Sequence, residues 1–447
     1  MTSRTSIRND LYELLRLAWP VVLSRLGIMT MGVIDTVVVG RFSTDQLAFQ
    51  VLGWSVFGVV VNAGIGLVQG TQVMTARHLG EGRPQAVGGV LRRGCVYGFW
   101  IGAAFAVPLY LFGREFFEAL RLNQDLARGA AGVLSVFALC LPFTIVGTAA
   151  SLYLEGLSRP KPVMVATWAC NLLNLALDLV LVPGAFGFPA MGAQGAAWGT
   201  FGARLALMVW LFIHIARMKD ARAMGVFAPP VDGKAAAVEQ RRIGYGAGAS
   251  LLVEAAAFGG MSVVAGWIGG LAVAAWGVMI NVSAVIFMMP LGLAAATAVL
   301  TGRAYGAGNT AAVRRVGLLG FGVAIAVLTG VAVVVLVAAR PIAMTFTTDP
   351  MLVPIAAGGL ALCSLFFVAD GLQVVAAQAL RARSDIVVPT LSHILSYLVV
   401  MGPLAWFLAL PMGLGLSGIV WSAFAASILA AGMLIGRFLF LTRKGAA

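Results

Sequence analysis

The sequence predicts an all-α polytopic membrane protein, with about twelve transmembrane helices in two pseudo-symmetric six-helix lobes. Three observations support this prediction: the composition, the number of long apolar stretches and an internal repeat. Hydrophobic residues make up 60% of the chain and charged residues only 11%, whereas a soluble protein carries about 25% charged residues. This composition excludes an ordinary soluble protein.

About twelve apolar stretches are long enough to cross the ~30 Å hydrocarbon core of a bilayer. Their approximate centres, in chain order, are Leu26, Val61, Ala103, Phe143, Leu173, Leu205, Ala256, Ser283, Ala326, Phe366, Val399 and Leu429. The first stretch is too long for the apolar part of a cleavable signal peptide. We therefore expect it to remain in the protein as a transmembrane helix.

Alternate loops of the chain are rich in arginine and lysine. The basic loops contain Arg77, Arg83, Arg92 and Arg93; Lys219, Arg222, Lys234, Arg241 and Arg242; Arg303, Arg314 and Arg315; and, at the C-terminus, Arg443 and Lys444. Cytoplasmic loops of membrane proteins carry such an excess, which places both termini and the middle loop on the cytoplasmic side of a bacterial inner membrane. The net charge of +13 therefore indicates topology and not nucleic-acid binding.

The two halves of the chain repeat each other. One block recurs at an offset of 226, pairing Gly66 with Gly292, Thr71 with Thr297, Arg77 with Arg303 and Gly80 with Gly306. A second block recurs at an offset of 223, pairing Trp198 with Trp421 and Phe201 with Phe424. Because each half has about six helices, both halves have the same orientation, as in transporters built from parallel repeats. We predict an N-terminal lobe at residues 1–217, a cytoplasmic linker loop at 218–242 and a C-terminal lobe at 243–447.

Charged and amide side chains inside the predicted helices of the first half are candidate functional residues, because a charge at bilayer depth costs on the order of 3 kcal/mol or more. Asp35 lies in an apolar helix whose other deep charge is Arg25. Asn171, Asn174 and Asp178 share one face of a later helix. The structural alternatives are that Asp35 pairs with Arg25 or joins helices, and that the two asparagines make only interhelical hydrogen bonds.

The second half contains a similar set of deep polar residues. Glu254 lies in its first predicted helix, Asn281 in the next, and Asp370 precedes Gln373 by three residues in a third. Oxygen-rich clusters suit hard cations such as Na⁺. A desolvated carboxylate can instead take and release protons near neutral pH. The residues by themselves leave both ions open.

The sequence contains no motif of a catalytic or cofactor site. The four cysteines lie in apolar segments without metal-ligand spacing, and the three histidines are scattered. Walker, H-E-x-x-H and G-x-S-x-G motifs are missing from the sequence. We therefore expect no enzymatic activity, no cofactor, and no metal other than a Na⁺ ion at Asp35, Asn174 and Asp178, if Na⁺ is the ion bound there.

Several motifs resemble the multidrug and toxic compound extrusion (MATE) family of transporters. They are LAWP at Leu17–Pro20, GVIDTVVVG at Gly32–Gly40, ARHLGEG at Ala76–Gly82, NLALDLVL at Asn174–Leu181, GAQGAAWGT at Gly192–Thr200 and DGLQVVAAQALRARSD at Asp370–Asp385. The resemblance extends over nearly the whole chain. It implies a V-shaped MATE-type fold and secondary active multidrug efflux, in which cationic amphipathic compounds leave by antiport with inward Na⁺ or H⁺.

The resemblance also implies two sets of site residues in a monomer that binds small organic cations. The first-lobe cation site would comprise Asp35, Asn174, Asp178 and Thr200. Glu254 and Asp370 match acidic positions of NorM-type pumps, and we expect them to bind a second cation or the substrate together with Asn281 and Gln373. The pairing of Asp178 with Asn174 resembles the DinF-type branch, so the chain mixes features of two branches.

The alternative function is a flippase of a lipid-linked sugar or another lipid, because such proteins share the architecture of the wider superfamily. A polyanionic headgroup requires a cavity lined by arginine and lysine. Arg25 and Arg204 are the only deep cations that the predicted helices contain. This scarcity of positive charge favours the export of cations.

Overall fold

The computed structural model describes residues 2–120 and 123–443, and side chains from Ile7 onward. Lys444, one of the residues used to predict the orientation of the C-terminus, lies outside the described residues. Twelve helical spans in the described part are long and apolar enough to cross a membrane. Each predicted centre lies in one of these spans, so the prediction of twelve transmembrane helices is confirmed.

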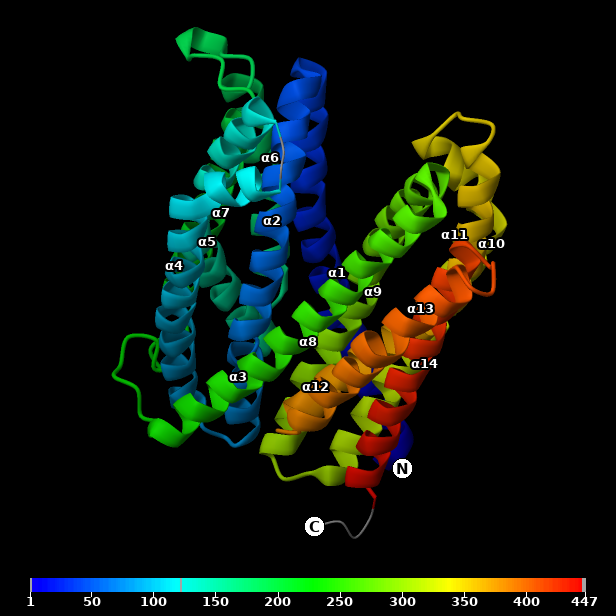
Figure 1. The fold of residues 1–447 in the computed structure, drawn as a ribbon. Coiled ribbons are helices and arrows are strands. Elements are labelled where there is room, and N and C mark those ends of the chain that lie inside the picture. The colour runs from blue at the N-terminus through cyan, green and yellow to red at the C-terminus, as the bar shows by residue number, and fades with distance from the viewer. Residues whose placement is uncertain (1, 121–122, 444–447) are drawn as a thin grey trace. The chain divides into compact units, whose positions relative to one another are not determined.

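The helices follow one another along the chain without intervening strands in the described residues (Figure 1). They are α1 (Thr2–Phe42), α2 (Thr44–Val68), α3 (Gly70–Gly80), α4 (Val87–Ala119), α5 (Gln124–Gly156), α6 (Lys161–Leu181), α7 (Ala193–Arg217), α8 (Lys234–Ile268), α9 (Gly270–Gly306), α10 (Thr310–Phe346), α11 (Leu352–Ala382), α12 (Val387–His393), α13 (Gly402–Ala409) and α14 (Leu416–Leu441). A π-helical segment, Ile394–Met401, joins α12 to α13.

The chain forms two compact units whose boundaries lie inside helices. Residues Leu23–Gly248 form one, here called the N-unit, and Met1–Val22 with Ala249–Ala447 form the other, here called the C-unit. Helices α1 and α8 therefore each begin in one unit and end in the other. The predicted division placed the boundary in a loop at residues 218–242, whereas α8 already begins at Lys234.

The repeated glycines explain why these two helices change units. A Cβ atom at Gly66 of α2 would come within 2.5 Å of Gly248 Cα on α8. Its repeat partner, Gly292 of α9, lies so close to α1 that a Cβ there would come within 2.9 Å of the backbone nitrogen of Val22. The start of each half thus packs on a glycine of the other half, and only a residue without a side chain permits this approach.

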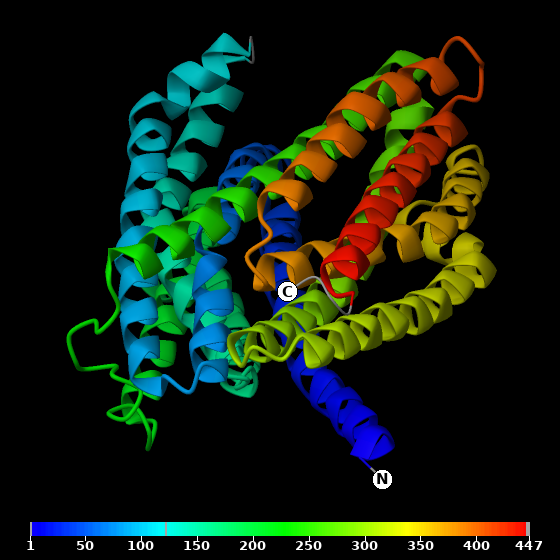
Figure 2. The same ribbon diagram turned by 90° about the horizontal axis from the view of Figure 1, so that it is seen from below.

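Helix α5 is the central helix of the N-unit. It packs against α2, α3, α4 and α7, and these helices run side by side in two perpendicular views (Figure 1, Figure 2). The rings of Phe57 on α2 and Phe137 on α5 stack at 4.6 Å between centroids, and Trp54 packs on the same Phe137 ring. Such aromatic pairs combine a large buried apolar area with a preferred geometry, which fixes α2 against α5.

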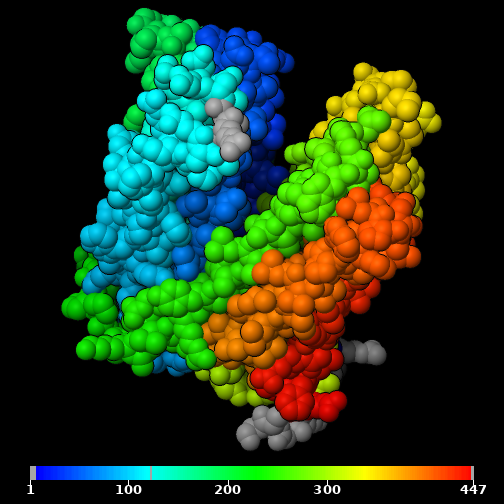
Figure 3. Space-filling view, in the orientation of Figure 1, coloured from blue at the N-terminus to red at the C-terminus, as the bar shows by residue number. Residues whose placement is uncertain are grey.

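Helix α11 has the corresponding place in the C-unit. It packs against α9, α10 and α14. Helix α14 also packs against α13, and the two form one continuous surface, orange and red in Figure 3. This arrangement brings polar residues of α11 and α14 together inside the C-unit.

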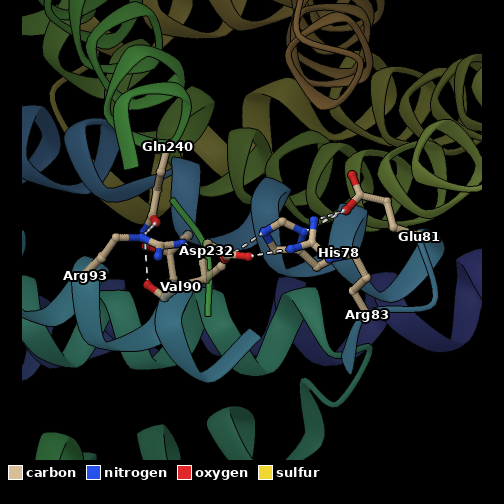
Figure 4. A network of polar contacts seen from close by, with 8 residues as sticks. His78, Glu81, Arg83, Val90, Arg93, Asp232 and Gln240 are labelled. Atoms are coloured by element: carbon tan, nitrogen blue, oxygen red, sulfur yellow. Dashed lines mark hydrogen bonds and ion pairs between the residues drawn. The ribbon is translucent and has the colours of Figure 1, made fainter. Parts of the chain in front are cut away.

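The basic middle stretch of the chain packs against α3 and α4 within the N-unit. The carboxylate of Asp232 is 2% exposed and lies 2.9 Å from Arg83 Nη2, 3.2 Å from Arg93 Nη2 and 3.3 Å from His78 Nε2 (Figure 4). Arg93 also donates through Nε to Gln240 Oε1 at 3.1 Å. The residues between α7 and α8 are therefore fixed to α3 and α4 through the buried carboxylate of Asp232 and do not form a loose linker.

Candidate functional site

Four of the predicted residues meet inside the N-unit. Asp35 on α1, Asn174 and Asp178 on α6, and Thr200 on α7 are all fully buried. The Thr200 hydroxyl donates to Asp35 Oδ2 at 2.5 Å, and Asn174 Nδ2 donates to Asp178 Oδ1 at 3.5 Å. The Asp178 carboxyl group lies within hydrogen-bonding reach of the Asp35 carboxyl group. These four residues are called the N-cluster below.

Local sequence explains how the N-cluster forms. Asn174 and Asp178 are four residues apart, so their side chains lie one turn apart on the same face of α6. Gly199 provides the space for them, because a Cβ atom at this position would overlap Asp178 Oδ1. Asn171 takes a different role and donates to the Gly27 carbonyl of α1 at 2.7 Å. That hydrogen bond joins α6 to α1 beside the cluster.

The N-cluster contains more acceptors than donors. Within the described part of the chain, Asp35 Oδ1, Asn174 Oδ1 and Asp178 Oδ2 are buried and have no hydrogen-bond partner. Buried polar atoms of this kind carry a large free-energy penalty unless they are satisfied. A bound cation, or a proton shared between the two carboxyl groups, would satisfy them. The geometry therefore suits a monovalent cation or a proton.

A second cluster forms in the C-unit. Gln373 on α11 donates through Nε2 to Glu254 Oε1 on α8 at 3.3 Å and, at 3.5 Å, to Asp370 Oδ1. Tyr397 donates to Asp370 Oδ1 at 3.2 Å, and Ser427 on α14 donates to the same atom at 3.3 Å. These five residues, each 9% exposed or less, are called the C-cluster below.

Sequence reasoning found part of the C-cluster and missed the rest. Tyr397 and Ser427 carry no formal charge, so the search for deep charges did not find them. The signal that could have identified Tyr397 is structural, since it lies in the π-helical segment, a geometry that is frequent at functional sites. Asn281 stays outside the hydrogen-bonded cluster, because its exposed side chain donates to the Gly277 carbonyl of its own helix at 2.8 Å.

A buried charge pair in the N-unit was also missed. Glu155 at the end of α5 is 2% exposed and accepts hydrogen bonds from Arg25 Nη2 on α1 at 3.1 and 3.3 Å. Gln72 Nε2 on α3 donates to Glu155 Oε2 at 2.7 Å. The structural alternative in which Arg25 pairs with Asp35 is not what the structure has, because Arg25 pairs with Glu155.

Comparison with known proteins identifies the family. The sequence model of one family, described as MatE, matches residues 20–180 and matches again at residues 247–407. The chain belongs to the MatE family. The double match also agrees with the internal repeat, since each match covers one half of the chain.

Curated MATE relatives cover nearly the whole chain. The Probable multidrug resistance protein NorM of Caulobacter vibrioides is 51% identical over 440 residues, which is 98% of this chain and 93% of that protein. A protein of the same name from Deinococcus radiodurans is 33% identical over 99% of this chain and 98% of its own length. This multi-pass membrane protein is thus a NorM-type MATE transporter and not an enzyme, so Asn174 and Asp178 occur here within a NorM-type chain.

Solved MATE structures have the same fold. The crystal structure of a eukaryotic MATE transporter matches with a TM-score of 0.89 at 16% identity, covering 98% of this chain and 97% of that one. The structure of a variant of the Vibrio cholerae MATE transporter VcmN matches with a TM-score of 0.89 at 18% identity and covers 99% of both chains. The predicted MATE-type fold is therefore confirmed.

Proposed function

We propose that this MATE transporter performs multidrug efflux, exporting cationic amphipathic compounds by antiport with an inward Na⁺ or H⁺. The observation that carries the proposal is the N-cluster, where two buried carboxyl groups lie within hydrogen-bonding reach of each other and three oxygens have no hydrogen-bond partner among the described residues. The names of the curated relatives, which are multidrug resistance proteins, support the substrate class. An unpaired charge inside the membrane is costly, and the binding of a coupling cation gives the two carboxylates a reason to be there.

In this proposal Asp35, Asn174, Asp178 and Thr200 bind the coupling cation. Their buried oxygens can replace the hydration shell of Na⁺ or can hold a proton between the carboxyl groups. Binding would cancel the repulsion between the two carboxylates. One charge crossing a potential of 100 mV releases ~2.3 kcal/mol, which corresponds to a substrate gradient of about forty-fold.

The C-cluster would bind the organic cation or a second coupling cation. Glu254 and Asp370 supply negative charge, and Gln373 holds both carboxylates in one place. The ring of Phe258 lies 6.1 Å from that of Tyr397 and 6.2 Å from that of Phe366, so aromatic surface adjoins the carboxylates. Aromatic faces attract organic cations.

The proposed setting is a monomer in a bacterial inner membrane, with both termini in the cytoplasm. The basic loops support this orientation through the positive-inside rule. The bacterial sources of the relatives support the membrane.

Transport in proteoliposomes tests the proposal. Uptake of a fluorescent organic cation such as ethidium would be measured under an imposed Na⁺ gradient and, separately, under a pH gradient. Wild type would be compared with Asp35→Asn and Glu254→Gln, with Asp45→Asn, an exposed carboxylate at the start of α2, as the matched control.

The proposal predicts that one of the two gradients drives uptake by the wild type. Uptake by Asp35→Asn should be at least about ten-fold slower than by the wild type, and uptake by Asp45→Asn should equal it. If the uptake rate changes with neither gradient and with neither substitution, antiport through these carboxylates would be disproved. Flipping of a lipid-linked sugar would then be the function to test.

A further inference from the structure

An arginine is buried inside the C-unit beside the C-cluster. Arg381, the next-to-last residue of α11, is 3% exposed. Its guanidinium donates from Nη2 to Ser250 Oγ on α8 at 2.6 Å, and its Nε is buried without a hydrogen-bond partner among the described residues. The sequence count of deep cations, Arg25 and Arg204, did not include it, because an arginine at the end of a helix is ordinary. The described part of the chain thus buries a full positive charge against a neutral hydroxyl group.

The contacts of Arg381 place its charge about one helical turn from the C-cluster. Its partner Ser250 precedes Glu254 by four residues on α8, so these two side chains lie one turn apart on the same face. On α11, Arg381 follows Asp370 by about three full turns, and helical side chains lean toward the start of their helix, here toward Asp370. Arg381 and Glu254 therefore interact electrostatically.

The buried charges of the C-unit do not balance. Among its described residues, the charged side chains that are less than about a tenth exposed are Glu254, Asp370 and Arg381. A cation bound at the C-cluster favours the ionised form of both carboxyl groups. Two negative charges and one positive charge then leave a net charge of −1. A substrate with one positive charge would neutralise this site, whereas a substrate with two would leave a buried excess of positive charge, which is costly.

The histidine beside Arg381 does not alter this balance. His393 on α12 is 3% exposed, and its ring nitrogens have no hydrogen-bond partner among the described residues. Its ring lies 5.8 Å from that of Tyr397, and its charged form would interact with Arg381. Like charges repel strongly in a low-dielectric interior. We therefore count His393 as neutral.

We propose that Arg381 selects the charge of the exported compound: it makes the C-cluster a site for organic cations with one positive charge and disfavours those with two. Arg381 does not contact the substrate in this scheme, because its charge acts by offsetting one of the two carboxylates. The inference rests on the proposed binding of an organic cation by Glu254 and Asp370. It adds a residue that determines specificity from outside the C-cluster.

Ethidium and propidium are a matched pair of probes, because they share one phenanthridinium ring system and carry one and two positive charges, respectively. Fluorescence titration of the purified full-length protein gives the affinity for each, and the ratio of propidium affinity to ethidium affinity is the readout. We expect Arg381→Gln to raise this ratio at least about ten-fold, as for the loss of one nearby charge in a protein interior. A residue that only joins α8 to α11 would weaken the binding of both probes alike.

Two further variants serve as controls for Arg381→Gln. Arg381→Lys keeps the positive charge and should keep the wild-type ratio. Arg340→Gln makes the same change at an exposed arginine of the C-unit, on α10. It should leave both affinities unchanged.

Ser250→Asp tests the proposal without removing the guanidinium. The new carboxylate would pair with Arg381 at the place where Ser250 Oγ now accepts from Nη2, and would cancel its charge. The variant should therefore raise the ratio as Arg381→Gln does. Ser250→Asn, which has the same shape without the charge, should not raise it.

An unchanged ratio in Arg381→Gln or in Ser250→Asp, or an equal loss of affinity for both probes, would overturn the proposal. If one of these two variants does not fold, the other decides. Normal ethidium affinity in both Glu254→Gln and Asp370→Asn would refute the C-cluster as the substrate site, and the inference with it. The titrations use no ion gradient, so a failure of the proposed antiport would be seen in the uptake experiment and not in this one.

Discussion

Arg25 on α1 bonds both carboxylate oxygens of Glu155 on α5, at 3.1 and 3.3 Å. The two side chains are 17% and 2% exposed, so the ion pair is largely shielded from water. This pairing removes Arg25 as the counterion of Asp35. Asp35 instead has Thr200 and Asp178 as neighbours, and we propose that this arrangement leaves its carboxylate available to a mobile cation.

Thr200→Val should weaken binding of the coupling cation. The change keeps the shape of the side chain and removes the hydroxyl that donates to Asp35 Oδ2 at 2.5 Å. A hydrogen bond to a charged group contributes about 1.5–3 kcal/mol, so the apparent affinity should fall about 10- to 100-fold. The measurement is uptake as a function of the driving-ion concentration, and Thr200→Ser, which keeps the hydroxyl, should resemble wild type.

Tyr397→Phe should weaken the C-cluster while the fold is kept. The ring remains packed against Phe258 and His393, but the donor to Asp370 at 3.2 Å is lost. We expect the affinity for an organic cation to change about five-fold or more, because the lost hydrogen bond contributes about 1 kcal/mol or more. Fluorescence titration with ethidium measures it. Tyr110→Phe on α4, where the tyrosine is 53% exposed, is the control, and equal affinities in both variants would contradict the prediction.

Gly199→Ala should abolish most transport, even though alanine is usually better than glycine in a helix by about 1 kcal/mol. The new Cβ atom would overlap Asp178 Oδ1 and displace it from the N-cluster. At Gly202, three residues later, a Cβ atom would meet only the movable end of Leu177 at 2.9 Å. Gly202→Ala should therefore keep its activity. Gradient-driven uptake and thermal unfolding of both variants provide the comparison.

Asp232→Asn should loosen the middle stretch of the chain from α3 and α4. The substitution leaves His78, Arg83 and Arg93 facing one another without the buried carboxylate (Figure 4). Because Arg83 is 49% exposed, solvent screens part of the effect, and we expect a loss of about 1–2 kcal/mol of stability.

Hydrogen exchange at residues 218–233 measures this loosening. Asp125→Asn is its control, since Asp125 is 91% exposed and lies 3.8 Å from Arg128. Exchange that is equally slow in wild type and Asp232→Asn would show that the carboxylate does not hold the stretch in place.

The polar composition of residues 218–242 predicts a linker loop, yet α8 begins at Lys234. Polar residues in a sequence indicate exposure to water or to other polar groups, and composition does not separate the two. Here Gln240 lies buried, bonded to Thr71 and to the Val90 carbonyl. Only the packing of this stretch against α3 and α4 shows that it is helical and ordered from Lys234 onward.

The deep charges could be recognised from the sequence because a bilayer makes each of them costly. Asp35 and Asp178 were found in this way, and so were Glu254 and Asp370. Glu155 could not be recognised in this way, because it lies at the end of its helix and four residues before Arg159, where charged residues are common. Tyr397 and Ser427 could not be recognised either, because burying a neutral hydroxyl group in a membrane costs little free energy and such groups are common in apolar helices.

The sequence by itself determined the class, the twelve spans, the repeat and the family resemblance, because the length and apolar character of a transmembrane helix are local properties. Tertiary structure alone decided which polar groups meet. The bonds from Thr200 to Asp35 and from Arg25 to Glu155 join residues 165 and 130 positions apart. No local pattern encodes such pairings, since they depend on how helices pack and on where a glycine such as Gly199 leaves room.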